Sequence, residues 1–269
     1  MIKALISDYD GTLTDHTHQL TEAVVEAVRA FQKQGFIFSI ATGRMYQGIV
    51  AASAAELGVS TPLIVRGGSE IINPNTKAVL WSKYIDSETV TALIPYLHTF
   101  ADQFHFAAES GDFAYTKDGI IVKEFGTGAQ FADLATIPHD RVPKIVIEPA
   151  SPEPMVDELI SDLAAKFPLL HLAKITSRRG YGIDINSHEA GKENALKAWA
   201  SLMNLELTEI AGIGDGHNDY PLLINCGYKI AMGNAPDSLK AIADLVVSTQ
   251  AEDGVAEAVE TLENLTKRD

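Results

Sequence analysis

The chain has 269 residues, of which 46% are hydrophobic and 21% charged, enough to build one large domain or two modest ones. It carries 36 acidic against 21 basic residues, a net charge of −15, which argues against nucleic acid as the main partner because Lys and Arg hold phosphate backbones. A small anionic substrate would need local positive charge, and a bound cation can supply it.

Cysteine content and hydropathy bear on the cellular location. The single cysteine, Cys226, cannot form an internal disulfide, which suits a reducing compartment. The first residues read as a strand and not as a signal peptide. No apolar run approaches the ~18 residues that a membrane helix needs. We therefore expect a cytoplasmic protein with no membrane partner.

The first third of the chain alternates between two periodicities. Buried-strand patterns cover residues 2–8, 36–41 and 62–65, and helical patterns cover 21–34 and 45–57. Thr21 is a suitable N-cap for the first helix, and Gly35 is a suitable stop. Alternating strands and helices predict right-handed crossovers and a parallel sheet.

The same alternation returns near the end of the chain. The predicted helices cover residues 191–203, 219–225, 236–242 and 254–265. The predicted strands between them cover residues 209–215, 228–232 and 244–247. We expect both ends of the chain to build one sheet.

The middle of the chain has a different pattern. Strand-like segments cover residues 105–110, 113–116, 144–149, 169–177 and 181–186. They are accompanied by a helix with Met155, Leu159 and Leu163 on one face. Neighbouring strands joined by short connections indicate an antiparallel α+β unit. The predicted fold class is therefore α/β, with a core from residues 1–81 and 187–269 and an inserted domain from 82–186.

Polar side chains follow the predicted core strands where those strands end. In an open parallel sheet, ligands bind beyond the carboxyl ends of the strands. Lys192 opens a helix just after the inserted domain and can join them. The residues at the strand ends are Asp8, Asp10, Thr42, Asp215, Asn218 and Asp219.

Several carboxylates in one pocket repel one another unless a cation binds them. Oxygen ligands favour a hard ion such as Mg²⁺, with Asp8 and Asp215 as carboxylate ligands and the Asp10 carbonyl oxygen as another. A metal-bound Asp8 stays ionised and can attack phosphorus as a nucleophile. Asp10 points to the same side if the chain stays extended, and it can act as general acid and base.

A phosphoryl group in this pocket needs donors for its oxygens. The Thr42 hydroxyl, the Lys192 ammonium group and backbone N–H groups can supply them, and Gly43 lets the backbone come close to a ligand. Arg44 lies at the start of the helix predicted at about 45–57, and in the first turn of a helix a cation opposes the helix dipole. That position favours a substrate-binding role for Arg44.

Four segments carry a resemblance to a known family. DYDGTLTD (8–15), ATGR (41–44), Lys192 within HEAGKENAL (188–196) and GIGDGHNDYPLL (212–223) resemble the signature motifs of the haloacid dehalogenase-like hydrolases. Residues 231–260 also resemble the Cof-type phosphatase branch of that family. The resemblance implies a Rossmann-like core with a cap inserted between the second and third motifs. It also implies a Mg²⁺-dependent phosphatase that hydrolyses small phosphomonoesters, such as sugar phosphates, through an aspartyl-phosphate.

The motif match implies a role for each site residue. It makes Asp8 the nucleophile, Asp10 the acid and base, and Asp215 a metal ligand. Thr42 and Lys192 become phosphate binders. Asn218 and Asp219 support the phosphate, Lys192 and the metal shell. The sequence departs from the branch at 66–68, where Arg-Gly-Gly replaces the common Asn-Gly-Ala.

Other interpretations remain open from the sequence. A phosphomutase or phosphotransferase would use the same core, and a phospho-aspartate switch would gather similar residues, although Asp10 and the insertion argue against a switch. Arg178 and Arg179 fit a solvated loop better than a substrate site, and residues 15–18 are a weak candidate for a transition-metal cluster. The sequence specifies neither the particular substrate nor the oligomeric state.

Overall fold

A five-stranded parallel sheet lies at the centre of one of the two units into which the chain folds. The computed structural model describes residues 1–15, 17–117, 130–177 and 179–266; of residue 266 it describes the backbone alone. The first unit, here called the core unit, comprises Met1–Tyr46, Val50–Trp81 and Lys192–Asp269. The second, here called the cap unit, comprises Gln47–Ile49 and Ser82–Gly191.

The core sheet has the strand order β14-β13-β12-β1-β2, and all its pairs are parallel. A parallel bridge between Ala41 and Ile64 adds β3 (Leu63–Val65) beyond β2. The order reverses between β1 and β12, which is where ligands bind in open sheets of this kind. The strands are β1 (Ala4–Ser7), β2 (Ile37–Ile40), β12 (Ile210–Gly214), β13 (Tyr228–Ala231) and β14 (Leu245–Val246).

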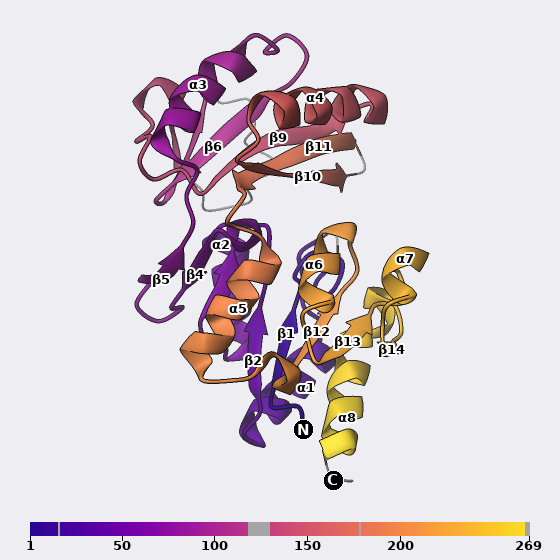
Figure 1. Ribbon diagram of the computed structural model, residues 1–269. Helices are drawn as coiled ribbons and strands as arrows, with labels where there is room; N and C mark the ends of the chain where they lie inside the picture. Colours follow the sequence, from indigo (N-terminus) through magenta and orange to yellow (C-terminus); the bar gives the residue numbers. More distant parts are fainter. Residues whose placement is uncertain (16, 118–129, 178, 267–269) are drawn as a thin grey trace. The chain divides into compact units, whose positions relative to one another are not determined.

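Helices cover both faces of this sheet, so its central strands are apolar throughout. All residues of β1 and β12 are buried, as expected for a parallel sheet covered on two sides. In Figure 1, α5 and α6 lie on the near face of the sheet, while α1 packs against β2 and α8. The helices are α1 (Glu22–Lys33), α2 (Gly48–Leu57), α5 (Lys192–Met203), α6 (Tyr220–Leu223), α7 (Asp237–Lys240) and α8 (Gly254–Thr266).

Local sequence accounts for the limits of α1. The Thr21 side chain caps it by accepting the Val24 N–H at 3.3 Å, and the helix buries Val24, Val28 and Phe31. Gly35 follows with φ +94°, a backbone conformation that glycine adopts without a steric penalty. The predicted helix at 21–34 is therefore confirmed.

A small antiparallel sheet extends the core unit beyond β3. Its order is β3-β4-β5, with β4 at Glu70–Ile72 and β5 at Val79–Ser82. These two strands, which are short and separated by a polar turn, were not predicted from the sequence. Between β3 and β4 lies a 3₁₀ turn, Arg66–Gly68.

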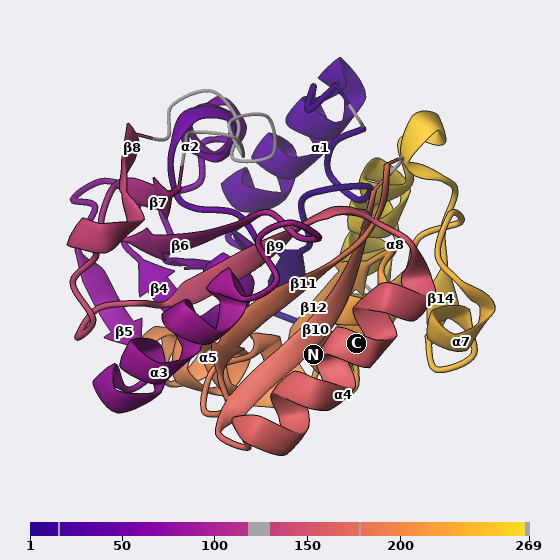
Figure 2. The ribbon, with the colours of Figure 1, turned by 90° about the horizontal axis from the view of Figure 1, so that it is seen from above.

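The cap unit is an antiparallel sheet with helices on one face. Its order is β10-β11-β9-β6-β7-β8, and every pair is antiparallel except β7–β8. Figures 1 and 2 show α3 (Ser87–His98) and α4 (Glu153–Lys166) on the same face of this sheet. The strands are β6 (Phe106–Ser110), β7 (Phe113–Thr116), β8 (Gln130–Asp133), β9 (Lys144–Ser151), β10 (Leu170–Ser177) and β11 (Gly180–Ser187).

The predicted fold class is confirmed, and two helices differ from the prediction. Helix α3, whose N-cap is Asp86 and whose interior contains Pro95, was not predicted. The second helix was predicted to start at residue 45, whereas α2 begins at Gly48, where φ is +50°. Among the described residues, no helix has the length and apolar character to cross a membrane.

Candidate active site

The centre of the candidate site is an ion pair between Asp8 and Lys192. Asp8 follows the carboxyl end of β1, and Lys192 is the first residue of α5. The Lys192 ammonium group donates a hydrogen bond to Asp8 Oδ1 at 2.5 Å. Asp8 is 5% exposed and Lys192 4%, so water screens the pair little.

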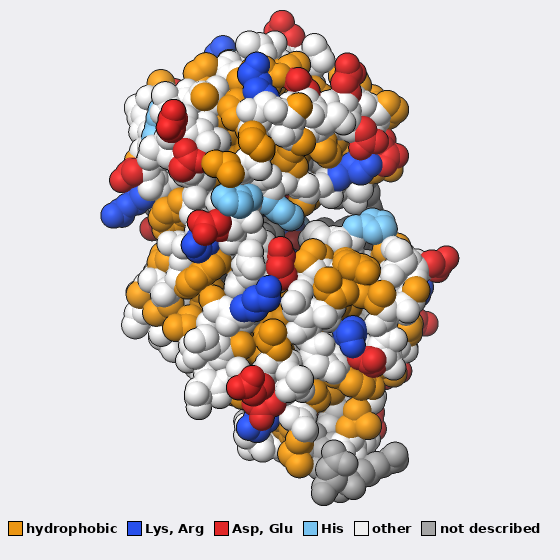
Figure 3. Space-filling view, viewed as in Figure 1, with side chains coloured by type: hydrophobic (Ala, Val, Ile, Leu, Met, Phe, Trp, Pro, Cys, Tyr) orange, Lys and Arg blue, Asp and Glu red, His pale blue; other side chains and the backbone are white. Residues whose placement is uncertain are grey.

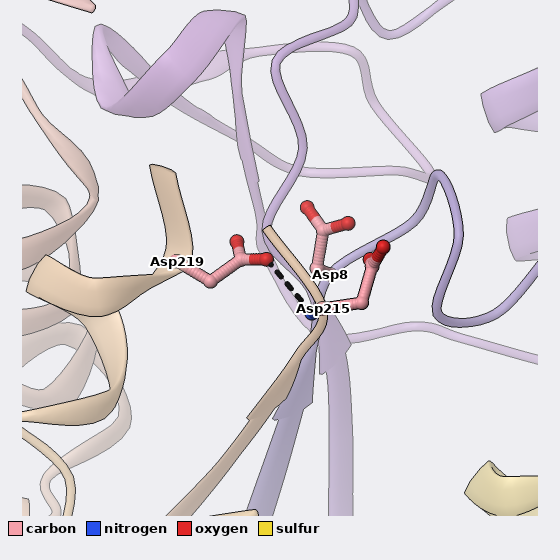
Figure 4. Close-up of side chains that lie close together, drawn as sticks. All are labelled: Asp8, Asp215 and Asp219. Carbon is pink, nitrogen blue, oxygen red and sulfur yellow. Dashed lines mark hydrogen bonds between the residues drawn. The ribbon is translucent and has the colours of Figure 1, made fainter. Parts of the chain in front are cut away.

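Asp219 holds Lys192 from the other side. Its Oδ1 accepts a hydrogen bond from Lys192 Nζ at 2.5 Å. Its Oδ2 accepts the N–H groups of Asp215 at 3.1 Å and Gly216 at 2.9 Å, the first of which is drawn in Figure 4. Both oxygens of Asp219 are thus occupied by protein donors, which fixes the turn after β12 and the position of Lys192.

Asp215 completes the group of carboxylates. Thr12 Oγ1 donates to its Oδ1 at 2.8 Å, and Asn234 Nδ2 donates to its Oδ2 at 3.2 Å. Asn234 also donates to the Gly11 carbonyl oxygen at 2.9 Å, so one side chain joins the turns after β1 and β12. Gly11 has φ +83°, and a Cβ atom there would clash with the Asp215 carboxylate. The close approach of backbone and carboxylate therefore requires glycine.

The electrostatics of this group show a shortage of positive charge. Burial and the neighbouring Asp219 raise the pKa of Asp8, against the opposite effect of Lys192. Burial and Asp219 also raise the pKa of Asp215, to about 6. Burial opposes the charge on Lys192, but Asp219 and Asp8 outweigh it and raise its pKa. One ammonium group thus faces three carboxylates.

The donor set fits a divalent cation. Oxygen atoms of Asp8, Asp215 and Asp219 lie within 4.8 Å of one another, and Figure 4 shows the three side chains converging. Since Asp219 already accepts three hydrogen bonds, Asp8 and Asp215 are the better ligands. Hard cations such as Mg²⁺ prefer oxygen ligands of this type.

Thr42 and Gly43 form a short loop after β2. The Thr42 side chain is fully buried, and its hydroxyl oxygen accepts the Arg44 N–H at 3.1 Å. The Thr42 N–H donates to the Ile64 carbonyl oxygen at 2.9 Å, which joins the loop to β3. The loop therefore lies at the same edge of the sheet as Asp8.

Asp10 has different partners from Asp8. Arg44 Nε donates to its Oδ2 at 2.7 Å, and His18 Nδ1 lies 3.3 Å from its Oδ1. Desolvation acts to raise the pKa of Asp10, but the neighbouring His18 and Arg44 side chains outweigh it and lower the pKa. The helix-dipole reason given for Arg44 is wrong, because α2 begins only at Gly48; Arg44 lies in the loop and binds a carboxylate.

The remaining candidates from the sequence are Asn218, Arg178, Arg179 and His16. Asn218 is exposed in the 3₁₀ turn His217–Asp219. Arg179 donates to Glu148 in the cap unit, while Arg178 and His16 lie outside the described residues. On the face seen in Figure 3, described Lys and Arg side chains lie scattered among Asp and Glu.

Sequence reasoning missed three polar residues of the site. Thr12 and Asn234 bind Asp215, and His18 contacts Asp10. Asn234 follows β13, the strand next to β12, so the strand-end rule that identified Asp215 could also have found it. Thr12 lies within the first motif, but its partner is 203 residues away and no local pattern shows it.

The core unit is thus a parallel sheet with a strand-order reversal, and three carboxylates and a lysine lie together at that point. Residues 5–259 match the family of haloacid dehalogenase-like hydrolases. The chain belongs to this family, and the predictions of family and of an enzyme are confirmed.

Relatives and solved structures resemble the chain over nearly its full length. Phosphatase YwpJ of Bacillus subtilis is 26% identical, covering 97% of this chain and 100% of its own. A phosphoglycolate phosphatase of Methanothermobacter thermautotrophicus is 24% identical, covering 96% and 97%. The crystal structure of a haloacid dehalogenase-like hydrolase from Bacteroides thetaiotaomicron superposes with a TM-score of 0.83 at 25% identity, covering 97% and 100%.

Proposed function

We propose that the protein is a Mg²⁺-dependent phosphatase that hydrolyses small phosphomonoesters through a phosphorylated Asp8. The observation that carries this proposal is the bonding of Lys192 to both Asp8 and Asp219, beside Asp215, at the point where the strand order reverses. A nucleophile, a phosphate-binding cation and a metal-binding carboxylate then share one edge of the sheet.

The reaction has two steps in this proposal. An Asp8 oxygen attacks phosphorus, the bond from phosphorus to the leaving oxygen breaks, and Asp10 gives that oxygen a proton. Water then attacks the phosphorus, Asp10 takes its proton, and phosphate leaves Asp8. The contacts of Asp10 with Arg44 and His18 keep it ionised, which suits the second step. The first step needs a protonated Asp10 and therefore a weaker bond to Arg44.

Charge on the phosphoryl oxygens needs compensation in both steps. Lys192, the Thr42 hydroxyl group, the Gly43 N–H and the Asn218 side chain are the proposed donors. Asp8 and Asp215, with the Asp10 carbonyl oxygen, are the proposed ligands of Mg²⁺. When bound, Mg²⁺ supplies the positive charge that brings a phosphate dianion close to an ionised Asp8.

The proposed substrates are small phosphorylated metabolites, sugar phosphates among them, with Arg44 as a contact for the substrate. Support comes from the names of relatives, such as the phosphoglycolate phosphatase that is 24% identical to this chain. The cytoplasmic location stays a prediction that rests on the single buried cysteine.

The test is phosphate release from p-nitrophenyl phosphate and from a panel of phosphorylated metabolites, with Mg²⁺ or with a chelator. Asp8→Asn should abolish turnover and leave the circular dichroism spectrum unchanged. The control Asp102→Asn, at an exposed position, should keep both the wild-type turnover rate and the wild-type spectrum. Asp10→Asn should slow alkyl phosphates more than p-nitrophenyl phosphate, because nitrophenolate leaves without a proton. Wild-type rates in Asp8→Asn, or no release from any phosphomonoester, would contradict the proposal.

A further inference from the structure

Three consecutive residues after β3 have left-handed backbones. Arg66 has φ +55°, Gly67 +68° and Gly68 +95°. Glycine adopts this region readily, but a residue with a Cβ atom does so rarely and only where its surroundings hold it there. Arg66 is therefore the one member of this turn whose conformation needs an external anchor.

The turn donates two hydrogen bonds to the loop that carries Thr42. The Arg66 N–H donates to the Arg44 carbonyl oxygen at 2.9 Å, and the Gly67 N–H donates to the Thr42 carbonyl oxygen at 3.0 Å. These two carbonyl groups flank Gly43, so the turn is hydrogen-bonded to the loop on both sides of its glycine. The dihedral angles of Arg66 set the direction of the Gly67 N–H relative to the Arg66 N–H, so the left-handed conformation is the one in which both groups reach the loop.

The anchor is a buried ion pair. Arg66 Nη1 lies 3.3 Å from Glu70 Oε2. Arg66 is 3% exposed and Glu70 4%, and Glu70 belongs to β4, where it pairs with Val65 of β3. The side chain of the turn's first residue is thus attached to the strand that follows the turn, and α5, which begins with Lys192, packs against the same turn.

We propose that Arg66 is a positioning residue that fixes the phosphate-binding loop. Its ion pair with Glu70 holds residues 66–68 in the left-handed turn, and the turn holds Thr42, Gly43 and Arg44 in the geometry that receives a phosphoryl group. This inference rests on the proposed function. Arg66 acts through the backbone and does not touch the substrate, because its guanidinium group is buried against Glu70.

A rescue experiment tests this role. Glu70→Gln removes the anchoring charge and leaves a strained arginine in the turn. The double variant Arg66→Gly/Glu70→Gln lacks the ion pair as well, but its residue 66 adopts the left-handed conformation freely. A third variant, Arg66→Ala/Glu70→Gln, differs from the second only in the Cβ atom. The readouts are the inhibition constant of inorganic phosphate, kcat/KM with p-nitrophenyl phosphate, and the melting temperature.

We expect Glu70→Gln and Arg66→Ala/Glu70→Gln to weaken phosphate inhibition and to lower kcat/KM by about five- to tenfold, the order of the left-handed penalty for a residue with a Cβ atom. Arg66→Gly/Glu70→Gln should return both values to within about twofold of wild type. A change in melting temperature alone, with phosphate inhibition unaltered, would show a merely structural ion pair.

Two other results would overturn the inference. Equal losses in the glycine and alanine variants would mean that the guanidinium group itself acts on the ligand. An unchanged Glu70→Gln variant would mean that the loop keeps its shape without the anchor. Failure of the proposed function is separate, because it would appear as absent turnover in the wild-type enzyme.

Discussion

Lys192 donates a hydrogen bond to Asp8 at 2.5 Å although the two residues lie 184 positions apart in the sequence. The same ammonium group donates to Asp219, so a single buried cation joins the turns after β1 and β12. With burial this deep, each member depends on the others for compensation of its charge.

Removal of the ammonium group should impair both turnover and folding. Lys192→Met keeps most of the side-chain volume but leaves Asp8 and Asp219 without their counter-charge. We expect kcat/KM to fall by at least about 100-fold, and the free energy of unfolding to fall by about 3 kcal/mol without Mg²⁺. Steady-state kinetics and urea denaturation measure the two effects.

The matched control is Lys197→Met, on an exposed position of the same helix α5. It should alter both values little, since substitutions at exposed positions usually change stability by less than about 0.5 kcal/mol. A Lys192→Met enzyme with wild-type kcat/KM would remove Lys192 from the site.

Asp219→Asn should destabilise the turn after β12. Both oxygens of Asp219 accept hydrogen bonds, from Lys192 on one side and from the N–H groups of Asp215 and Gly216 on the other. The Asn amide has one acceptor oxygen in place of two, so its NH₂ group would face either the Lys192 ammonium group or the two backbone N–H groups, which are all donors. We expect a loss of about 2–3 kcal/mol in thermal or urea unfolding. Asp237→Asn, exposed at the start of α7, should cost about 0.5 kcal/mol or less; equal costs would contradict the assigned contacts.

The stability of the metal-free protein should depend on Asp215. Its pKa is about 6 in the folded protein, against about 3.9 in an unfolded chain, so the folded state binds the proton more tightly. This contribution is fully present below pH ~4 and is lost as the pH rises to ~6. Between pH 4 and pH 7, wild type should lose about 2 kcal/mol relative to Asp215→Asn, measured by urea denaturation.

Mg²⁺ should reverse that loss at pH 7, because it replaces the proton on the carboxylate group. The melting temperature of wild type should rise on addition of Mg²⁺, and that of Asp215→Asn should rise much less. Equal rises in the two proteins would place the ion elsewhere.

Cys226 should be unreactive in the folded protein. It is 5% exposed, and burial raises its pKa to about 12, so almost no thiolate exists at neutral pH. We expect iodoacetamide at pH 8 to label the unfolded chain rapidly and the native protein at least about 100-fold more slowly. Mass spectrometry follows the labelling, and rapid native labelling would indicate local opening around α6.

The position of the catalytic candidates was predictable because parallel strands end at a common edge. Periodicity located β1, β2 and β12, and the polar residues just after them then had to lie near one another. The strands β4 and β5 and the capped helix α3 escaped prediction. β4 has only three residues, one of them charged, β5 is the partly exposed edge strand of its sheet, and α3 contains an internal proline.

Sequence by itself predicted the fold class, because local periodicity carries that information, and the family, through the resemblance of four segments to signature motifs. It also proposed Asp8, Lys192 and Asp215 as site candidates. Only the tertiary structure decided how these residues are bonded. It showed that Asp219 holds Lys192, that Arg44 binds Asp10, and that Arg66 forms an ion pair with Glu70. The first two contacts join residues far apart in the chain, and they form only where the packed sheet brings its strand ends together. The Arg66–Glu70 ion pair is local, but it depends on a turn that no local pattern predicts.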